Sequence, residues 1–299
     1  YVYWLFIFFI GHFLLVHFFL NFYRYFIMSK LIFYNVDTDN YSIDNDVFDT
    51  IELQKNYQNN TPFPHVVISS AIDQAILNDI AEEVNNFQPK VQKKFYGSIK
   101  KFSESKIDIL PRKTQKLLAF LNSDEFLQGI TRITGVEGLI PDPSYEGGGV
   151  HKTYKGGFLK IHTDFNWNSK LKAYRRINVI IYLNKDWKDI WGGGCELWLY
   201  DRETEVKEVK PLFNNLIIFD TNDFTFHGHP FPLKCPKDRS RNSIAVYYYT
   251  KHKDSNYHKR KSEETTYAET RSSHINMSLF DKLKIITPLV IKKLVTKKE

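Results

Sequence analysis

Cysteine is scarce in this chain of 299 residues, which contains only Cys195 and Cys235. Two cysteines allow at most one disulfide bond, so a small secreted fold held by a disulfide framework is excluded and a reducing compartment is favoured. The hydrophobic content of 42% is ordinary for a globular core. The length favours one catalytic domain with flanking segments over two equal domains.

The main part of the chain also lacks an excess of basic residues, although the net charge is +7. Residues 251–299 contain 12 Lys or Arg and 6 Asp or Glu, so almost all of the positive charge belongs to this tail. A protein that binds nucleic acid usually carries its positive charge on one face of the binding domain. We therefore expect no nucleic acid among the partners.

Residues 1–27 form a long hydrophobic run in which Arg24 is the single formal charge. Seventeen of the 27 are Val, Ile, Leu or Phe. The segment is therefore long and apolar enough to span a bilayer. Arg24 and Lys30 flank its C-terminal side, so an inserted leader would leave the rest of the chain in the cytoplasm. A second interpretation stays open, because the first methionine is Met28: the leader can be translated upstream DNA that is not native to the protein.

The segments after the leader differ in their apolar patterns. Residues 28–60 are polar and lack periodicity, which predicts a loosely ordered segment. Residues 63–68 predict a first strand, and a charged stretch covers 90–106. Apolar residues at helical spacing predict three scaffold helices, namely 71–87 with a capping box of Ser70 and Asp73, 111–121, and one from Ser123 to about Gly135.

Short strands dominate from Val136 onwards. The predicted strands are 150–154, 158–164, 176–183, 195–200, 215–219 and 242–249, separated by glycine-rich segments and a turn at 184–187. Many short strands without intervening helices favour an all-β barrel or jelly roll. Together with the preceding helices, this pattern predicts an α+β protein.

The domain organisation follows from these patterns. We expect a leader (1–27), a polar segment (28–60), a helical flank (61–140), a β core (141–252) and a basic tail (253–299). The tail ends in Leu279–Val295, a basic amphipathic stretch interrupted by Pro288. It predicts a helix that either docks on the outside of the domain or contacts a membrane surface.

His162, Asp164 and His227 are the candidate metal ligands. His162 and Asp164 are two residues apart, which places both side chains on one face of a strand. His227 follows the strand 215–219 and could close the third corner. Two imidazoles and one carboxylate are the ligand set that holds a non-haem Fe(II) and leaves positions open for substrate and oxygen.

Alternatives exist for parts of this site. His229 competes with His227 for the third position, because Gly228 between them makes strand parity unreliable; we favour His227. A zinc site of His227, His229 and Cys235 is less well supported, since it lacks a second Cys pair or a His partner at the usual spacing. His162 and Asp164 taken alone are also consistent with ordinary polar residues at a strand end.

A cosubstrate such as 2-oxoglutarate needs a cation to hold its distal carboxylate in a dry barrel. Arg241 meets this need, with Ser243 on the same strand face. Arg239 lies off the strand and is expected to be solvated. Tyr182 and Asn178 share one face of their strand and could donate hydrogen bonds to the cosubstrate, although core packing explains either of them equally well.

Five ordered pieces of the sequence resemble the prolyl-4-hydroxylase-like branch of the 2-oxoglutarate/Fe(II) oxygenases. They are His162-Thr163-Asp164, the run Tyr182–Trp187, Gly193-Gly194 before Glu196–Leu199, His227 with Pro230, and Arg241–Ala245. The likeness runs from about Thr153 to Thr250 and is weaker back to Phe63. Five pieces in order are far more specific than the three metal ligands alone.

The resemblance implies a double-stranded β-helix in which His162, Asp164 and His227 bind Fe(II). It assigns Arg241 and Ser243 to the C5 carboxylate of 2-oxoglutarate, and Tyr154 and Tyr182 to further cosubstrate contacts. It also implies a dioxygenase that uses O2, hydroxylates a substrate such as a prolyl or other peptidyl residue, and converts 2-oxoglutarate to succinate and CO2, with ascorbate as a reductant.

Two functions of other classes compete with this one. The first is a non-catalytic jelly-roll binding module, against which the complete set of metal ligands argues. The second is a membrane-anchored structural protein, which depends wholly on residues 1–27. We expect small-molecule and peptide partners, a cytoplasmic catalytic domain, and a membrane contact only if the leader is part of the protein.

Overall fold

The computed structural model describes residues 30–49, 51–89, 97–199, 206–253 and 261–268. The predicted leader, residues 1–27, and the predicted tail helix, Leu279–Val295, lie outside these ranges. Within the described ranges, no helix combines the length and the apolar character needed to cross a bilayer. The membrane anchor therefore stays a prediction.

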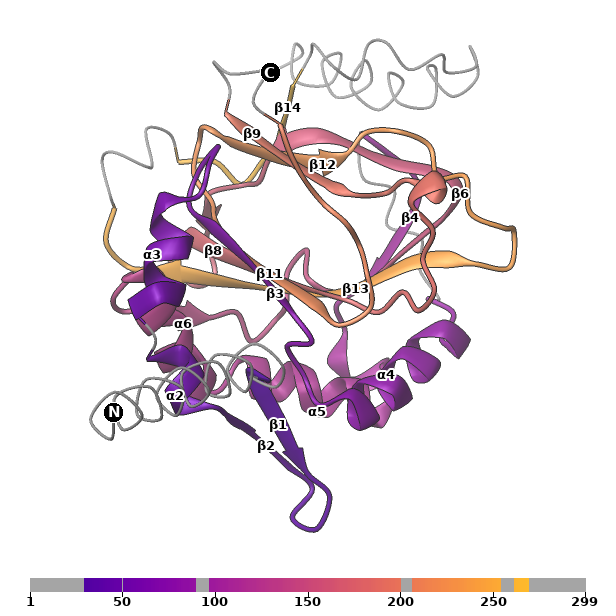
Figure 1. Cartoon of the computed structure of the whole chain (residues 1–299). Helices are drawn as coiled ribbons and strands as arrows, with labels where there is room; N and C mark the ends of the chain where they lie inside the picture. The colour runs from indigo at the N-terminus through magenta and orange to yellow at the C-terminus, as the bar shows by residue number, and fades with distance from the viewer. Residues whose placement is uncertain (1–29, 50, 90–96, 200–205, 254–260, 269–299) are drawn as a thin grey trace, which may run out of the picture.

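Two layers of antiparallel strands face each other and make the β core (Figure 1). The order of neighbouring strands is β10-β9-β12-β6-β13-β8-β11-β3. Their bounds are β3 His65–Ser69, β6 Gly149–Thr163, β8 Ala173–Tyr182, β9 Cys195–Leu199, β10 Lys207–Val209, β11 Asn215–Asp220, β12 Thr225–His229 and β13 Ser240–Thr250. The predicted α+β fold with a jelly-roll core is confirmed.

Strand β6 belongs to both layers. Its first part, residues 149–154, pairs with β13, and residues 159–162 pair with β12. The sequence predicts two strands here, 150–154 and 158–164, but the structure joins them into one 15-residue strand. Gly156, with a φ of 76°, lets the chain bend from one layer to the other without interrupting the strand.

A strand that the sequence does not predict, β4 at Ser98–Glu104, pairs with β6 on its other side. It lies within the charged stretch 90–106, where the apolar alternation typical of a strand is absent. Short strands complete the sheet at three places, namely β5 Ile140–Pro141 on β13, β7 Trp167–Asn168 on β8, and β14 Thr266–Tyr267 on β6.

The two faces of the larger layer have opposite character. Alternate residues of β8 (Ile177, Val179 and Ile181) belong to the main apolar cluster that the helices also join. The residues between them, such as Asn178 and Ile180, face the interior between the two layers and line a cavity. The period of two along a strand therefore separates the scaffold from the site.

Helices α4 Gln74–Asn86, α5 Arg112–Leu121 and α6 Asp124–Thr134 supply the apolar side chains of that cluster, and α4 and α5 lie below the sheet in Figure 1. Helix α6 begins and ends as predicted, because Ser123 caps it and Gly135, with a φ of 72°, stops it. The predicted capping box of α4 is wrong: Asp73 is the N-cap, and Ser70 lies in a left-handed turn before it.

Residues 30–59 contradict the predicted loosely ordered segment. They form the hairpin β1 Ile32–Asn35 and β2 Asn40–Ile43, followed by helices α2 Asn45–Phe48 and α3 Ile51–Asn59. Periodicity is weak because few residues per element are buried, but Leu31, Ile32, Phe48 and Tyr57 are nearly inaccessible in the main cluster. A few large anchors therefore order a segment whose average composition is polar.

Candidate metal and cosubstrate site

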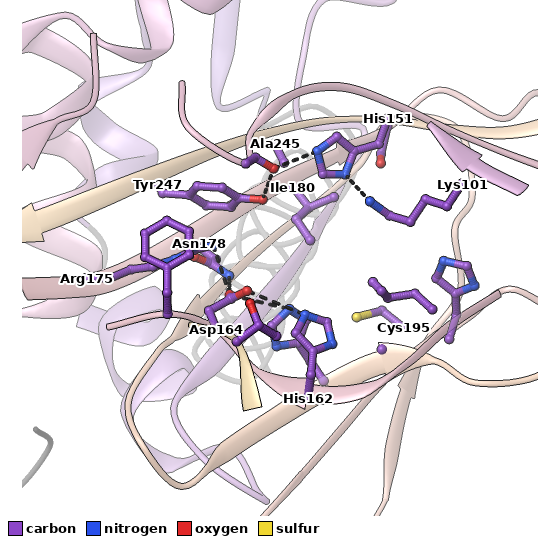
Figure 2. A pocket seen from close by; sticks show the side chains of 18 of the residues that line it. Lys101, His151, His162, Asp164, Arg175, Asn178, Ile180, Cys195, Ala245 and Tyr247 are labelled. Atoms are coloured by element: carbon purple, nitrogen blue, oxygen red, sulfur yellow. Dashed lines mark hydrogen bonds and ion pairs between the residues drawn. The ribbon is translucent and has the colours of Figure 1, made fainter. Parts of the chain in front are cut away.

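His162, Asp164 and His227 converge at one end of a cavity between the two layers (Figure 2). His162 lies on β6, Asp164 directly follows that strand, and His227 lies opposite His162 on β12. One potential ligand atom from each residue lies within 4.8 Å of the others. The imidazole Nε2 atoms of His162 and His227 are 3.5 and 3.6 Å from the two carboxylate oxygens of Asp164. The residues are thus arranged around a common point.

The orientation of His162 is set by its backbone. Its Nδ1 lies 2.8 Å from the carbonyl oxygen of Lys160, so Nδ1–H donates there and the Nε2 lone pair points toward Asp164. An imidazole that donates through one nitrogen and presents the other as a lone pair is how proteins prepare a metal ligand. His162 is therefore preorganised to bind a cation.

Asp164 is held by two residues that the sequence analysis did not combine with it. An Arg175 guanidinium nitrogen lies 2.9 Å from Oδ2, and Asn178 donates to the same oxygen at 2.8 Å. Arg175 also donates to the side-chain oxygen of Asn178, which locks the group. Burial alone would raise the pKa of Asp164, but the positive charge of Arg175 and the neighbouring imidazoles hold it well below its ordinary value. The carboxylate is therefore anionic and fixed.

The geometry of β12 places His227, and not His229, beside His162 and Asp164. The group of close ligand atoms contains His227, and within the described residues no such group contains His229. Burial lowers the pKa of His227 to about 3, so its ring is neutral and able to donate a lone pair. Gly228 lies where the register shifts, and a Cβ on it would stand 2.7 Å from the Lys160 carbonyl oxygen. Only glycine allows this close approach.

His229 lines the same cavity, and both of its buried ring nitrogens lack a hydrogen-bond partner within the described part of the chain. Cys235, by contrast, packs with Trp187 and Leu233 and does not line the cavity. The alternative zinc site of His227, His229 and Cys235 therefore does not assemble.

Arg241 lies on β13 and points into the cavity, as expected. Its Nε donates to the Gly193 carbonyl at 2.6 Å, and one terminal nitrogen donates to the Tyr182 hydroxyl at 3.4 Å. Gly193, with a φ of 84°, has space for the arginine only because it lacks a Cβ, which would stand 3.0 Å from the arginine side chain. The donors that remain on the guanidinium are available to an anion.

Arg239 and the other predicted cosubstrate residues lie at different places. Arg239 is outside the cavity, where it donates to the Lys185 carbonyl. Ser243 and Asn178 line the cavity, whereas Tyr182 is behind it against Arg241. The structure does not bring Tyr154 to the cavity: its hydroxyl donates to Gln88 at 3.3 Å. Tyr154 shares the outward face of β6 with Lys152, so strand parity excludes it.

Residues that the sequence analysis missed also line the cavity. Lys101 comes from the unpredicted strand β4, and His151 from β6 on the inward face. From the segment 261–268, Thr265 and Tyr267 line the cavity, and the ring of Tyr267 lies 5.6 Å from that of His162. Period-two alternation along β6 could have identified His151, but no local signal identifies Lys101 or Tyr267.

Comparison with known protein families finds a match within this core. Residues 148–249 match the 2OG-Fe(II) oxygenase superfamily. The match covers the strands that carry His162, Asp164, His227 and Arg241, and it confirms the resemblance seen in the sequence. No protein of curated function matches the chain.

Solved structures resemble part of this chain at low identity. A Pseudomonas putida prolyl-4-hydroxylase matches 66% of this chain and 98% of its own, with 16% identity and a TM-score of 0.43. A Trichoplax adhaerens prolyl hydroxylase, solved with a hypoxia-inducible-factor peptide fragment, matches 66% and 89%, with 19% identity and a TM-score of 0.46. HygX from Streptomyces hygroscopicus, solved with nickel, 2-oxoglutarate and hygromycin B, matches 67% and 87%, with 12% identity and a TM-score of 0.47.

Proposed function

We propose that this protein is a 2-oxoglutarate- and Fe(II)-dependent dioxygenase that hydroxylates a substrate while converting 2-oxoglutarate to succinate and CO2. One observation carries the proposal. His162, Asp164 and His227 meet in a cavity that also contains the guanidinium of Arg241. Two imidazoles, one carboxylate and a separate cation are the side chains that this chemistry requires.

The residues present fit Fe(II). The donor set of two nitrogens and one oxygen is the facial arrangement that leaves coordination positions open. The His162 tautomer, the anionic Asp164 and the neutral His227 each present a lone pair toward one point. Arg175 and Asn178 hold the carboxylate in the manner of an outer ligand shell. We therefore assign these three residues to the metal.

The remaining residues prepare the cavity for an anionic cosubstrate. Arg241 pairs with its distal carboxylate, with Ser243 on the same strand face and the Tyr182 hydroxyl holding the guanidinium. Leu159, Ile180 and Ala245 supply an apolar lining that limits water at the reacting atoms. When bound, Fe(II) and 2-oxoglutarate supply the oxidising chemistry, and the protein supplies geometry and charge complementarity.

Succinate formation tests this function. Purified protein with Fe(II), ascorbate, O2 and 2-oxoglutarate is expected to release succinate, and a screen of peptides and amino acids is expected to identify a substrate that accelerates release. Prolyl and other peptidyl residues are the first substrate class in that screen. The His162→Ala variant is the matched control without a metal ligand.

The competing function is a non-catalytic jelly-roll module. Anaerobic titration, read together with succinate release, separates the two, because 2-oxoglutarate binding to an oxygenase depends on bound Fe(II). Tight 2-oxoglutarate binding without any succinate release across the substrate screen would favour the module. Absence of metal-dependent 2-oxoglutarate binding would contradict the oxygenase directly.

A further inference from the structure

Lys101 places a second buried cation in the cavity that contains Arg241. It lies on β4, is 9% exposed, and lines the cavity beside His151. The register of β4 on β6 shifts between Ile99 and Lys101, and Lys100 between them has a φ of 48°. This irregularity turns Lys101 inward while Lys100 stays exposed. The inward lysine is thus specified by a local distortion of the strand.

His151 orients the lysine. The His151 Nε2 lies 3.0 Å from the Gly147 carbonyl, which also accepts the Tyr247 hydroxyl at 2.9 Å. Nε2–H therefore donates to Gly147, and the Nδ1 lone pair accepts from the Lys101 ammonium at 3.2 Å. Burial and the charge of Lys101 keep the pKa of His151 well below its ordinary value, which is consistent with a neutral acceptor. Figure 2 shows both side chains across the cavity from His162 and Asp164.

The described residues that line the cavity carry more positive than negative charge. Lys101, Arg175 and Arg241 are cations, and Asp164 is the one carboxylate among the described lining residues. Arg175 lies against Asp164, so the positive excess is concentrated at Lys101 and Arg241. Burial, together with the smaller effect of the Arg241 charge, lowers the pKa of Lys101 to about 8. Two like charges in a buried cavity repel, and an anion between them removes that repulsion.

We propose that Lys101, oriented by His151, binds the distal carboxylate of the cosubstrate together with Arg241. This inference rests on the proposed function. The other end of 2-oxoglutarate is accounted for by the metal, so the distal carboxylate is the cosubstrate anion left for two cations. Lys101 thereby makes the cavity selective for 2-oxo acids that carry a second carboxylate.

The test compares two ligands on protein loaded with Co(II) in place of iron, so that no turnover occurs. Isothermal titration calorimetry is run with 2-oxoglutarate and with 2-oxobutanoate, which has the same 2-oxo acid group but lacks the distal carboxylate. Lys101→Met is expected to weaken 2-oxoglutarate binding by roughly 10- to 100-fold, the loss typical of one charged hydrogen bond. Its affinity for 2-oxobutanoate is expected to change less than about twofold, within the usual context dependence of such contacts.

Matched variants separate charge from structure. Lys100→Met removes the exposed lysine next door and is expected to leave both affinities unchanged. Lys101→Arg keeps the charge and is expected to retain most of the 2-oxoglutarate affinity, and it also serves if Lys101→Met does not fold. His151→Phe removes the acceptor that orients the lysine and is expected to weaken 2-oxoglutarate selectively, but less than Lys101→Met does.

Three results would overturn the inference or its basis. An unchanged 2-oxoglutarate affinity in Lys101→Met, or an equal loss for both ligands, would remove Lys101 from the distal carboxylate site while leaving the oxygenase function intact. Failure of the wild-type protein to bind 2-oxoglutarate in the presence of Co(II) would instead contradict the proposed function itself, and the inference with it.

Discussion

The metal end and the cation end of the cavity differ in how their polar groups are satisfied. At the metal end, the one with His162, Asp164 and His227, His162 donates to a backbone carbonyl and Asp164 accepts from Arg175 and Asn178, so two of the three candidate ligands have a fixed partner. At the cation end, Arg241 and Lys101 share one buried space, and the ring nitrogens of His229 lack hydrogen-bond partners among the described residues. The first end holds its carboxylate in a fixed orientation, whereas the second gathers positive charge that a bound anion would offset.

The largest expected effect comes from removing a candidate metal ligand. Asp164→Ala removes the carboxylate from the ligand set and leaves the Arg175 guanidinium buried without its main counter-charge. We expect Fe(II) affinity to fall by more than about 100-fold, beyond the loss usual for outer-shell changes, and the free energy of unfolding to fall by about 3–5 kcal/mol. Anaerobic metal titration and chemical denaturation measure the two effects.

The control for this prediction is an exposed histidine, His252→Ala. It is expected to change neither quantity. Retention of wild-type metal affinity by Asp164→Ala would contradict the assignment of the ligand set.

The second-largest expected effect comes from removing a cation at the other end of the cavity. Arg241→Ala removes the guanidinium from the cavity, and loss of one partner of a buried ion pair costs about 3–5 kcal/mol. We therefore expect 2-oxoglutarate affinity to fall by at least about 100-fold, measured by calorimetry on metal-loaded protein. Metal affinity is expected to stay near the wild-type value, which distinguishes this variant from Asp164→Ala.

Arg239→Ala is the matched control, because Arg239 lies two residues away and outside the cavity. The two arginines would exchange roles if affinity were lost in Arg239→Ala and kept in Arg241→Ala.

A smaller effect on metal affinity is expected from a residue that holds Asp164. Asn178→Ala removes the amide that donates to Asp164 at 2.8 Å but leaves Arg175 in place. Loss of an outer-shell partner typically weakens metal binding by about 10- to 100-fold, and the lower part of that range is expected because one partner remains. Metal titration should place this variant between the wild type and Asp164→Ala; a loss as large as that of Asp164→Ala would make Asn178 part of the ligand set.

The last effect is the change with pH in the stability of the protein without ligands, which depends on Lys101. Lys101 has a pKa of about 8 in the folded state and an ordinary value of 10.5. Between these values the unfolded chain binds more protons at this residue than the folded one does, so the contribution of Lys101 to stability rises as pH increases from 8 toward 10.5. Below pH 8 the folded lysine is charged, and its destabilising effect is fully present.

Denaturation of the metal-free protein at pH 8 and pH 10 measures this rise. The comparison with Lys101→Met is decisive, because Tyr247 and Tyr249 have raised pKa values in the folded state and ionise near pH 10 mainly in the unfolded chain, an effect on stability that both proteins share. An identical pH dependence in the two proteins would contradict a buried, charged Lys101.

Much of the scaffold is determined by local patterns. Helix α6 is predicted from Ser123 to Gly135, because a capping side chain and a glycine in the left-handed region act within a few residues. The strands β8, β9, β11 and β13 follow from apolar and β-branched runs. The segment 30–59 and strand β4 were missed, since a few distant apolar contacts and pairing with β6 order them rather than their own periodicity.

The sequence by itself singled out His162, Asp164, His227 and Arg241 as candidates for one site, from their residue types, their spacing and five ordered pieces of family resemblance, with His229 left open as a rival to His227. Only the tertiary structure decided which neighbours complete them. It placed Arg175 against Asp164, turned Tyr154 away from the cavity, and brought Lys101 and Tyr267 from distant segments to its walls. The physical reason is that side-chain direction on a bent or bulged strand depends on its register with other strands, which no single stretch of sequence encodes.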